Sequence, residues 1–328
     1  MSKSIILALL LGLALLVSGA NAATTQAQPV SVDPAIKAYH SVGGISGNLN
    51  SIGSDTLNNL MTLWSESFRK VYPNVNIQVE GKGSSTAPPA LAEGTAQLGP
   101  MSRTMKASEI EAFEKRHGFK PTRIGVALDA LAVYVNKDNP LQSLTLPQVD
   151  AIFSKSRRGG LPEAIATWGQ VGLSGSWANK PISLYGRNSA SGTYGYFKEE
   201  ALFKGDYKDT VKEQPGSAAV VLGVTEDLSG IGYSGIGYRT SGVKVLKLAE
   251  KQGEEAFDGS YEHVLSGKYP LSRMLYIYVA KAPNKPMSPV VREFLRLALS
   301  REGQQVVIKD GYLPLPASVA QRQLALLE

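Results

Sequence analysis

The sequence predicts an α/β protein built as two lobes. Short apolar strands alternate with amphipathic helices from Ser51 onward, which is typical of mixed, mostly parallel sheets with helices on both faces. Two strongly apolar segments, 130–136 (ALAVYVN) and 274–280 (MLYIYVA), resemble each other in composition. If both cross between lobes, residues 45–131 and 274–328 form lobe I and residues 132–273 form lobe II. The alternative is that both are ordinary buried strands of one sheet.

The first residues have the order of a secretory signal peptide. A basic start is followed by an apolar run over 5–17 and by the small-residue segment that ends in Ala20-Asn21-Ala22. A membrane anchor is less favoured, because a bilayer span needs roughly 20 apolar residues. We therefore expect cleavage after residue 22. The segment 23–44, rich in Ala, Thr, Gln and Pro, is expected to be a flexible leader.

Composition narrows the class of protein. No cysteine is present, so we expect a hydrophobic core to stabilise the exported chain without disulfides, and no lipid anchor near the cleavage site. No later stretch is apolar enough to span a membrane, so a soluble protein is expected. The net charge is +6, but the basic residues are scattered, which does not favour a nucleic-acid partner.

Helices and strands of the first part are visible in the periodicity. Apolar residues at helical spacing predict a helix over 56–72 that ends before Pro73, and alternation predicts a strand over 75–81. A second helix follows, with Pro88 and Pro89 near its first turn and Gly94 near its end, and then a strand towards Met101. A third helix ends at Gly118, and Ser108 with Glu111 has the spacing of a capping box.

Three Gly/Ser-rich segments carry the chemistry: 53–57 (GSDTL), 81–89 (GKGSSTAPP) and 186–193 (GRNSASGT). Each follows a predicted strand and precedes a predicted helix, where free backbone N–H groups and the helix dipole attract anions. Each alone is also an ordinary N-cap. Three together, with Arg187 four residues before Ser191, favour a shared site for a tetrahedral oxyanion, since arginine adds a fixed charge and charge-assisted hydrogen bonds.

Other chemistries lack their residues in the sequence. The GKGSST segment does not have the order of a nucleotide-binding loop, and no G-x-G-x-x-G follows a first strand. His40, His117 and His263 are far apart and have no neighbouring ligand cluster, which argues against zinc. Ser191 is not in a nucleophile elbow. We expect a binding protein without catalytic residues, metal or cofactor.

At this level of detail the motifs resemble a known family. The signal peptide, GSDTL, GSS, GPMSR and GRNSASGT, in this order, are similar to the periplasmic phosphate-binding proteins of high-affinity phosphate ABC importers. The resemblance extends from about Ser51 to the C-terminus and includes SGIGYSGIGY at 229–238. It implies a type II periplasmic-binding-protein fold with two crossover strands. It also implies a periplasmic monomer that captures inorganic phosphate between its lobes and delivers it to an inner-membrane ABC permease complex.

The resemblance also implies a set of phosphate ligands. In the first segment these are the hydroxyl and amide of Thr56 and the amide of Leu57, and in the second the hydroxyl of Ser84. In the third segment the implied ligands are Arg187, Ser191, Gly192 and Thr193.

One position departs from the family pattern. The best-known members carry an aspartate after the serine of GPMS, where it accepts the proton of phosphate and rejects sulfate; here this residue is Arg103. Arg103 adds a cation to the expected site but cannot accept a proton. Asp129, just before the first crossover segment, is the first candidate for the acceptor and Asp55 the second. The alternatives are that Asp129 is a capped turn residue and that Asp55 only solvates its loop.

Three other functions stay open on the sequence alone. The first is the same fold used for another oxyanion, such as sulfate, molybdate or tungstate, an alternative that the Arg103 departure keeps open. An exported phosphate-binding-like protein that acts in adhesion or signalling is the second. A phosphatase is the third and the least favoured, because it lacks metal ligands and an activated nucleophile.

Overall fold

The computed structural model describes residues 29–328. The predicted signal peptide and residues 23–28 of the predicted leader lie outside this range. The strands are β1 (Gly47–Gly53), β2 (Val75–Gly81), β3 (Gly99–Met101), β4 (Thr122–Asn136), β5 (Ser143–Thr145), β6 (Ser183–Arg187), β7 (Lys212–Gln214), β8 (Gly230–Gly235), β9 (Val243–Val245), β10 (Lys247–Ala249) and β11 (Ser272–Val279). The helices are α1 (Asn58–Val71), α2 (Ala87–Glu93), α3 (Ala107–His117), α4 (Leu146–Phe153), α5 (Gly192–Glu200), α6 (Ser217–Glu226), α7 (Tyr261–Leu265), α8 (Pro289–Ala298), α9 (Arg301–Lys309) and α10 (Ala317–Ala325). Short 3-10 helices include η1 (Asp55–Leu57), η2 (Ser84–Thr86) and η5 (Ile236–Tyr238).

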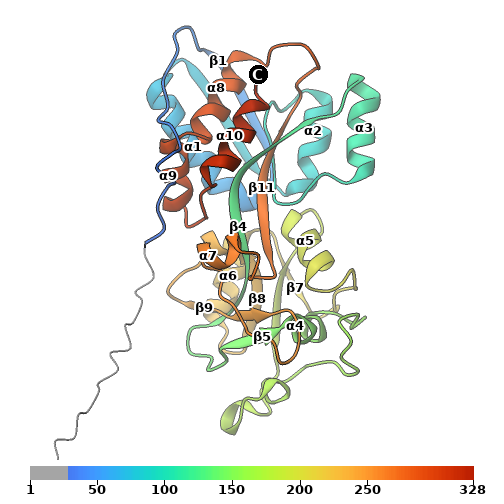
Figure 1. The fold of residues 1–328 in the computed structure, drawn as a ribbon. Coiled ribbons are helices and arrows are strands. Elements are labelled where there is room, and N and C mark those ends of the chain that lie inside the picture. The colour runs from blue at the N-terminus through green and yellow to red at the C-terminus, as the bar shows by residue number, and fades with distance from the viewer. Residues whose placement is uncertain (1–28) are drawn as a thin grey trace, which may run out of the picture.

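Two long strands join two lobes (Figure 1). β4 and β11 pair antiparallel and run from the upper lobe in Figure 1, which contains α1, α2 and α8, into the lower lobe, which contains α4, α5 and α6. Both predicted crossover segments lie in these strands, but β4 begins at Thr122, eight residues before the predicted segment. The first and last parts of the chain lie together in the upper lobe.

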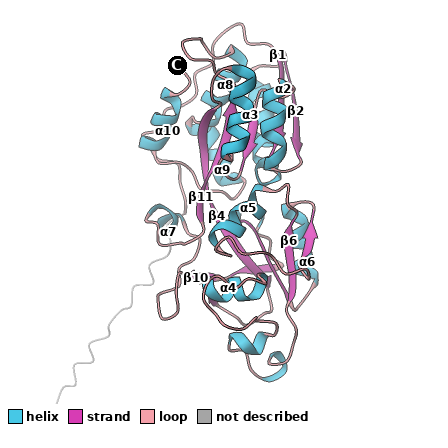
Figure 2. Ribbon diagram, turned by 90° about the vertical axis from the view of Figure 1, so that its right-hand side faces the viewer, coloured by secondary structure: helices cyan, strands magenta, loops and turns pink. Residues whose placement is uncertain are grey.

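The largest sheet contains both crossover strands. Its order is β3-β11-β4-β8-β6-β7, with β9 also paired to β4. The antiparallel pairings in it all involve β4 or β11, whereas β6 pairs in parallel with β7 and β8. β1 with β2, and β5 with β10, form two further parallel pairs. Mixed sheets flanked by helices in both lobes confirm the predicted α/β class (Figure 2).

Each lobe has a hydrophobic core of its own. Trp64 and Phe68 of α1 are fully buried in the first core, and Phe153 and Phe197 are fully buried in the second. Burying such a side chain contributes about 1.5–3 kcal/mol. Along β4, Ile124, Val126 and Ala127 belong to the first core, and Ala130, Leu131, Val133 and Val135 belong to the second. The lobe bounds at 131/132 and 273/274 stay a prediction that this change of core supports.

The helices that precede the crossover strand follow their local signals. α2 has proline in its first turn and ends at Gly94, whose φ of 75° is left-handed and suits glycine. The predicted capping box of α3 is wrong by two residues. The helix begins after Lys106, and the Glu109 carboxylate accepts the Lys106 N–H at 2.8 Å, which places Ser108 inside the first turn.

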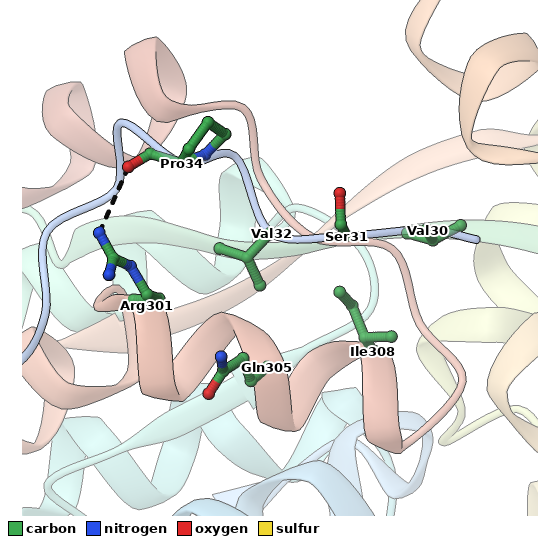
Figure 3. Close-up of a pocket in the computed structure, with 7 residues that line it drawn as sticks. All are labelled: Val30, Ser31, Val32, Pro34, Arg301, Gln305 and Ile308. Atoms are coloured by element: carbon green, nitrogen blue, oxygen red, sulfur yellow. Dashed lines mark hydrogen bonds between the residues drawn. The ribbon is translucent and has the colours of Figure 1, made fainter. Parts of the chain in front are cut away.

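The part of the predicted leader that the structure describes packs against lobe I. Residues 29–44 form no helix or strand, but Ile36 is buried, and the Tyr39 hydroxyl contacts Tyr72 at 2.6 Å and Glu293 at 2.9 Å. Arg301 of α9 donates to the carbonyl of Pro34, beside a surface pocket between this segment and α9 (Figure 3). The flexible leader expected from the sequence is therefore ordered over these residues. Sequence periodicity could not predict this, because the contacts with Glu293 and Arg301 are with residues more than 200 positions away.

None of the helices in the described range is long and apolar enough to cross a membrane.

The burial of Asp310, which follows α9, leads us to expect a pH dependence of stability. Its Oδ2 is buried and has no hydrogen-bond partner among residues 29–328, and burial raises the pKa of the carboxyl from 3.8 to about 7. The unfolded chain therefore ionises at lower pH than the folded one, so stability is lost as pH rises from about 4 to 7. We expect Asp310→Asn to raise the free energy of unfolding by about 1–2 kcal/mol at pH 8, allowing for partial exposure, and by much less at pH 4.

Urea unfolding at the two pH values measures this effect. Asp209→Asn is the matched control, because the Asp209 side chain is 90% exposed. An equal gain from Asp310→Asn at both pH values would contradict the assignment.

Candidate anion-binding site

The three Gly/Ser-rich segments meet between the lobes. η1 carries Thr56 in lobe I, and its hydroxyl lies 2.8 Å from the hydroxyl of Thr193 at the start of α5 in lobe II. The segment at η2 contacts the same region, because the Ser85 N–H donates to the Ala190 carbonyl at 3.1 Å. Segments that are more than 100 residues apart in sequence thus place buried hydroxyls side by side. The helix starts predicted from the sequence provide these positions.

Gly192 is a point of close approach between the two lobes. A Cβ at this residue would lie 2.2 Å from the Ser84 hydroxyl oxygen and 2.6 Å from that of Ser102. Ser191 is the N-cap of α5, and its hydroxyl accepts the N–H of Thr193 at 3.1 Å. The absence of a side chain at Gly192 therefore allows the α5 N-terminus to reach the lobe I serines.

Arg187, at the end of β6, is the buried cation of the site. Its residue is 1% exposed. Nη1 donates to the Ser217 hydroxyl at 2.7 Å and lies 3.1 Å from Oδ2 of Asp55, across the two lobes. Burial lowers the pKa of Arg187, and the Asp55 carboxylate opposes this shift. Nε is buried and has no hydrogen-bond partner within the described chain.

Arg103 is held away from this cluster by its own lobe. Its guanidinium makes two hydrogen bonds of 2.7 Å to the Glu109 carboxylate and one of 3.2 Å to the Ser85 hydroxyl. Burial alone would raise the pKa of Glu109, but the hydrogen bonds from Arg103 and from the Lys106 backbone lower it overall. The structure therefore does not favour a direct contact between Arg103 and the anion.

The structure distinguishes the two candidate proton acceptors. Asp129 is fully buried, and its Oδ2 accepts Arg273 Nε at 2.8 Å while Oδ1 accepts the Ile236 N–H at 3.0 Å. Asp55 is 19% exposed at its side chain, and its Oδ2 accepts the Ser217 N–H at 2.7 Å. No hydrogen bond to Asp55 Oδ1 is made within residues 29–328. Asp55 therefore keeps a carboxylate oxygen for a ligand, which Asp129 does not.

Leu57 has a role in packing as well as a candidate role in binding. Its side chain is fully buried in the lobe I core, and its N–H donates to the Ser54 carbonyl at 3.2 Å inside η1. The amide is thus already engaged by the turn that positions Thr56. Tyr312 supports the same turn, because its hydroxyl donates to the Thr56 carbonyl at 2.8 Å.

Sequence reasoning missed several residues around the site. These are Ser54, Ser102, Ser217, Tyr238, Arg273 and Tyr312, which bond to the predicted residues or to one another. Two signals were available in the sequence. Ser217 follows a glycine at a helix start, as Ser54 and Ser84 do, and Arg273 is a charge at the beginning of an apolar strand.

Comparisons with known proteins agree with this architecture, which is that of a two-lobed solute-binding protein. The family model described as a PBP superfamily domain matches residues 21–302, and the chain belongs to this superfamily. It is 57% identical over 316 residues to the phosphate-binding protein PstS of Pseudomonas aeruginosa, which covers 96% of this chain and 97% of that protein. It is 31% identical to the protein SphX of Synechococcus elongatus, over 81% of this chain and 77% of SphX.

Solved structures show the same fold. A substrate-binding protein from Clostridium perfringens, assigned to a phosphate ABC transporter and solved with bound phosphate, has a TM-score of 0.70 and 26% identity. The match covers 82% of this chain and all of that one. An ABC-type phosphate transport receptor from Vibrio cholerae, at 22% identity and a TM-score of 0.62, covers 81% of this chain and shares the fold.

Proposed function

We propose that this protein captures inorganic phosphate between its two lobes and delivers it to the permease of an ABC importer. The observation that carries the proposal is the buried Arg187, whose Nε has no acceptor within residues 29–328, although the guanidinium contacts Ser217 of lobe II and Asp55 of lobe I. Leaving such a donor unpaired costs about 1–3 kcal/mol, and a bound anion supplies the acceptor. The similarity to phosphate-binding PstS over nearly the whole chain supports phosphate as this anion.

Binding requires the lobes to separate and close again. Thr56 and Thr193 touch across the lobes, and both are buried, so an anion reaches them only after the lobes open. β4 and β11 are the connections about which this hinge motion occurs. Several charge-assisted hydrogen bonds of about 1.5–3 kcal/mol each, less the costs of desolvation and closure, allow micromolar or tighter binding. The closed form is the one presented to the permease.

Donors alone do not separate phosphate from sulfate, so the protein needs an acceptor for the phosphate proton. We propose Asp55 for this role in place of Asp129, because Asp55 Oδ1 remains available while both oxygens of Asp129 are occupied. The proposed ligands are then Thr56, Ser84, Ser191, Gly192, Thr193 and Arg187, with Asp55 as acceptor.

Isothermal titration of ligand-depleted protein tests the function and the selectivity. We expect one phosphate per chain, undisplaced by excess sulfate or molybdate.

In Asp55→Asn the ratio of phosphate to sulfate affinity is expected to fall by about 10-fold or more, since the acceptor is lost. In Asp129→Asn this ratio should stay within about threefold of the wild-type value. Equal binding of sulfate by the wild-type protein would reject phosphate specificity, and the opposite behaviour of the two variants would return the role to Asp129.

The proposed site of action is the periplasm. In this proposal the predicted signal peptide exports the chain, and the mature protein acts as a soluble monomer that binds phosphate. Loss of the gene should impair growth on limiting phosphate, and N-terminal sequencing of the exported protein should begin at Ala23. Unimpaired growth on limiting phosphate, together with an extracellular location of the protein, would favour the adhesive or signalling role. Release of phosphate from a generic phosphate ester would favour the phosphatase.

A further inference from the structure

Arg273 lies where both lobes and both crossover strands meet. It is on β11, directly opposite Asp129 of β4 in the strand register, and its side chain is 3% exposed. The two side chains form a buried ion pair, with Nε and Nη2 of Arg273 at 2.8 and 2.7 Å from Oδ2 of Asp129. The two donors share one acceptor oxygen, and the further bonds of Nη1 and Nη2 to Ser102 and Thr193 restrict the orientation of the guanidinium.

The rest of the guanidinium faces the two lobes. Nη1 donates to the carbonyl of Ser102 in lobe I at 3.0 Å, and Nη2 donates to the hydroxyl of Thr193 in lobe II at 3.0 Å. The ring of Tyr196 lies on one side, 5.3 Å from the guanidinium carbon. Arg273 is thus the charged group in direct contact with a hydroxyl of the candidate site, and sequence reasoning did not identify it.

The direction of the bond to Thr193 has a chemical consequence. A guanidinium only donates hydrogen bonds, so the Thr193 oxygen must accept from Arg273. An unprotonated oxygen of the anion cannot donate a hydrogen bond, so the Thr193 hydroxyl must donate to it. A hydroxyl that accepts from a cation is polarised and donates more strongly.

We propose that Arg273 is a positioning residue, which orients and polarises the Thr193 hydroxyl so that it donates to an unprotonated oxygen of the bound phosphate. This rests on the proposed function and adds a specific role within it. Arg187 and Arg273 then act differently on the anion, the first as a ligand and the second through Thr193. The proton of the phosphate is left to Asp55, which pairs with Arg187.

A double-mutant cycle tests the proposal. Arg273→Met alone leaves Asp129 buried and unpaired, so Arg273→Met is combined with Asp129→Leu, which removes both charges together. The phosphate affinity of this paired variant is measured with Thr193 intact and in a Thr193→Val background. With Thr193 intact we expect a loss of about 10- to 30-fold, and in the Thr193→Val background a further loss below about threefold.

A second variant guards against a change in folding. Arg273→Lys, with Asp129 retained, keeps a buried cation and a donor but not the planar set of donors, so we expect it to bind phosphate more weakly than the wild type and more tightly than the paired variant. Equal losses from the paired variant in both backgrounds would overturn the role through Thr193, even if the wild-type protein binds phosphate. Failure of the wild-type protein to bind phosphate would overturn the proposed function and this inference together.

Discussion

Gly192→Ala is expected to weaken phosphate binding by about 10- to 100-fold, which corresponds to a steric cost of about 1–3 kcal/mol in the closed form. The added Cβ would lie 2.2 Å from the Ser84 hydroxyl oxygen and 2.6 Å from that of Ser102. These oxygens belong to lobe I, whereas Gly192 begins α5 in lobe II. The methyl group therefore holds the lobes apart while helix α5 itself tolerates alanine.

Gly195→Ala is the matched control for this substitution. It lies one turn further along α5, and its added Cβ would meet only the Arg103 side chain, at an ordinary contact distance of 3.5 Å. We expect its phosphate affinity to stay within about threefold of the wild-type value, since no atom must move. Calorimetry measures both affinities, and thermal unfolding checks that both variants fold. Unchanged affinity in Gly192→Ala would contradict closure of α5 onto the lobe I serines.

Arg187→Met is expected to cause the largest loss of phosphate affinity, roughly 100- to 1,000-fold, because about two charge-assisted hydrogen bonds to the anion disappear. The substitution also removes the interlobe contact to Asp55, at 3.1 Å, and the contact to Ser217 within lobe II, at 2.7 Å. Methionine keeps much of the buried volume, so the lobe II core should remain folded.

Arg103→Gln tests whether phosphate affinity depends on any nearby cation or on Arg187 in particular. Arg103 is engaged by Glu109 and Ser85, so we expect its replacement to change phosphate affinity by less than about threefold while it lowers the stability of lobe I. A loss as large as that of Arg187→Met would restore Arg103 as a direct ligand. Unchanged affinity in Arg187→Met would contradict the central position of that cation.

Local signals in the sequence were sufficient for the elements that carry the site. The apolar periodicity of α1, the prolines of α2 and the serine at the start of α5 each depend on residues within one or two turns. The three helix starts and Arg187 could therefore be predicted, and their proximity followed from the two-lobe hypothesis. The structure adds the contacts between them.

Partners distant in sequence were beyond such reasoning. Arg273 and Asp129 are 144 residues apart, and only the register of β4 with β11 makes them neighbours. The preference for Asp129 as acceptor depended on a free carboxylate, and this ion pair removes that freedom. Packing of residues 33–42 on lobe I likewise depends on partners near the other end of the chain, such as Arg301.

A crystal structure of the protein saturated with phosphate tests most directly whether one anion bridges the lobes. The account predicts a single phosphate within hydrogen-bond distance of Thr56 and Ser84 in lobe I and of Arg187 and Thr193 in lobe II, with a protonated oxygen at Asp55. A phosphate that contacts one lobe only, or that lies away from Arg187, would contradict it.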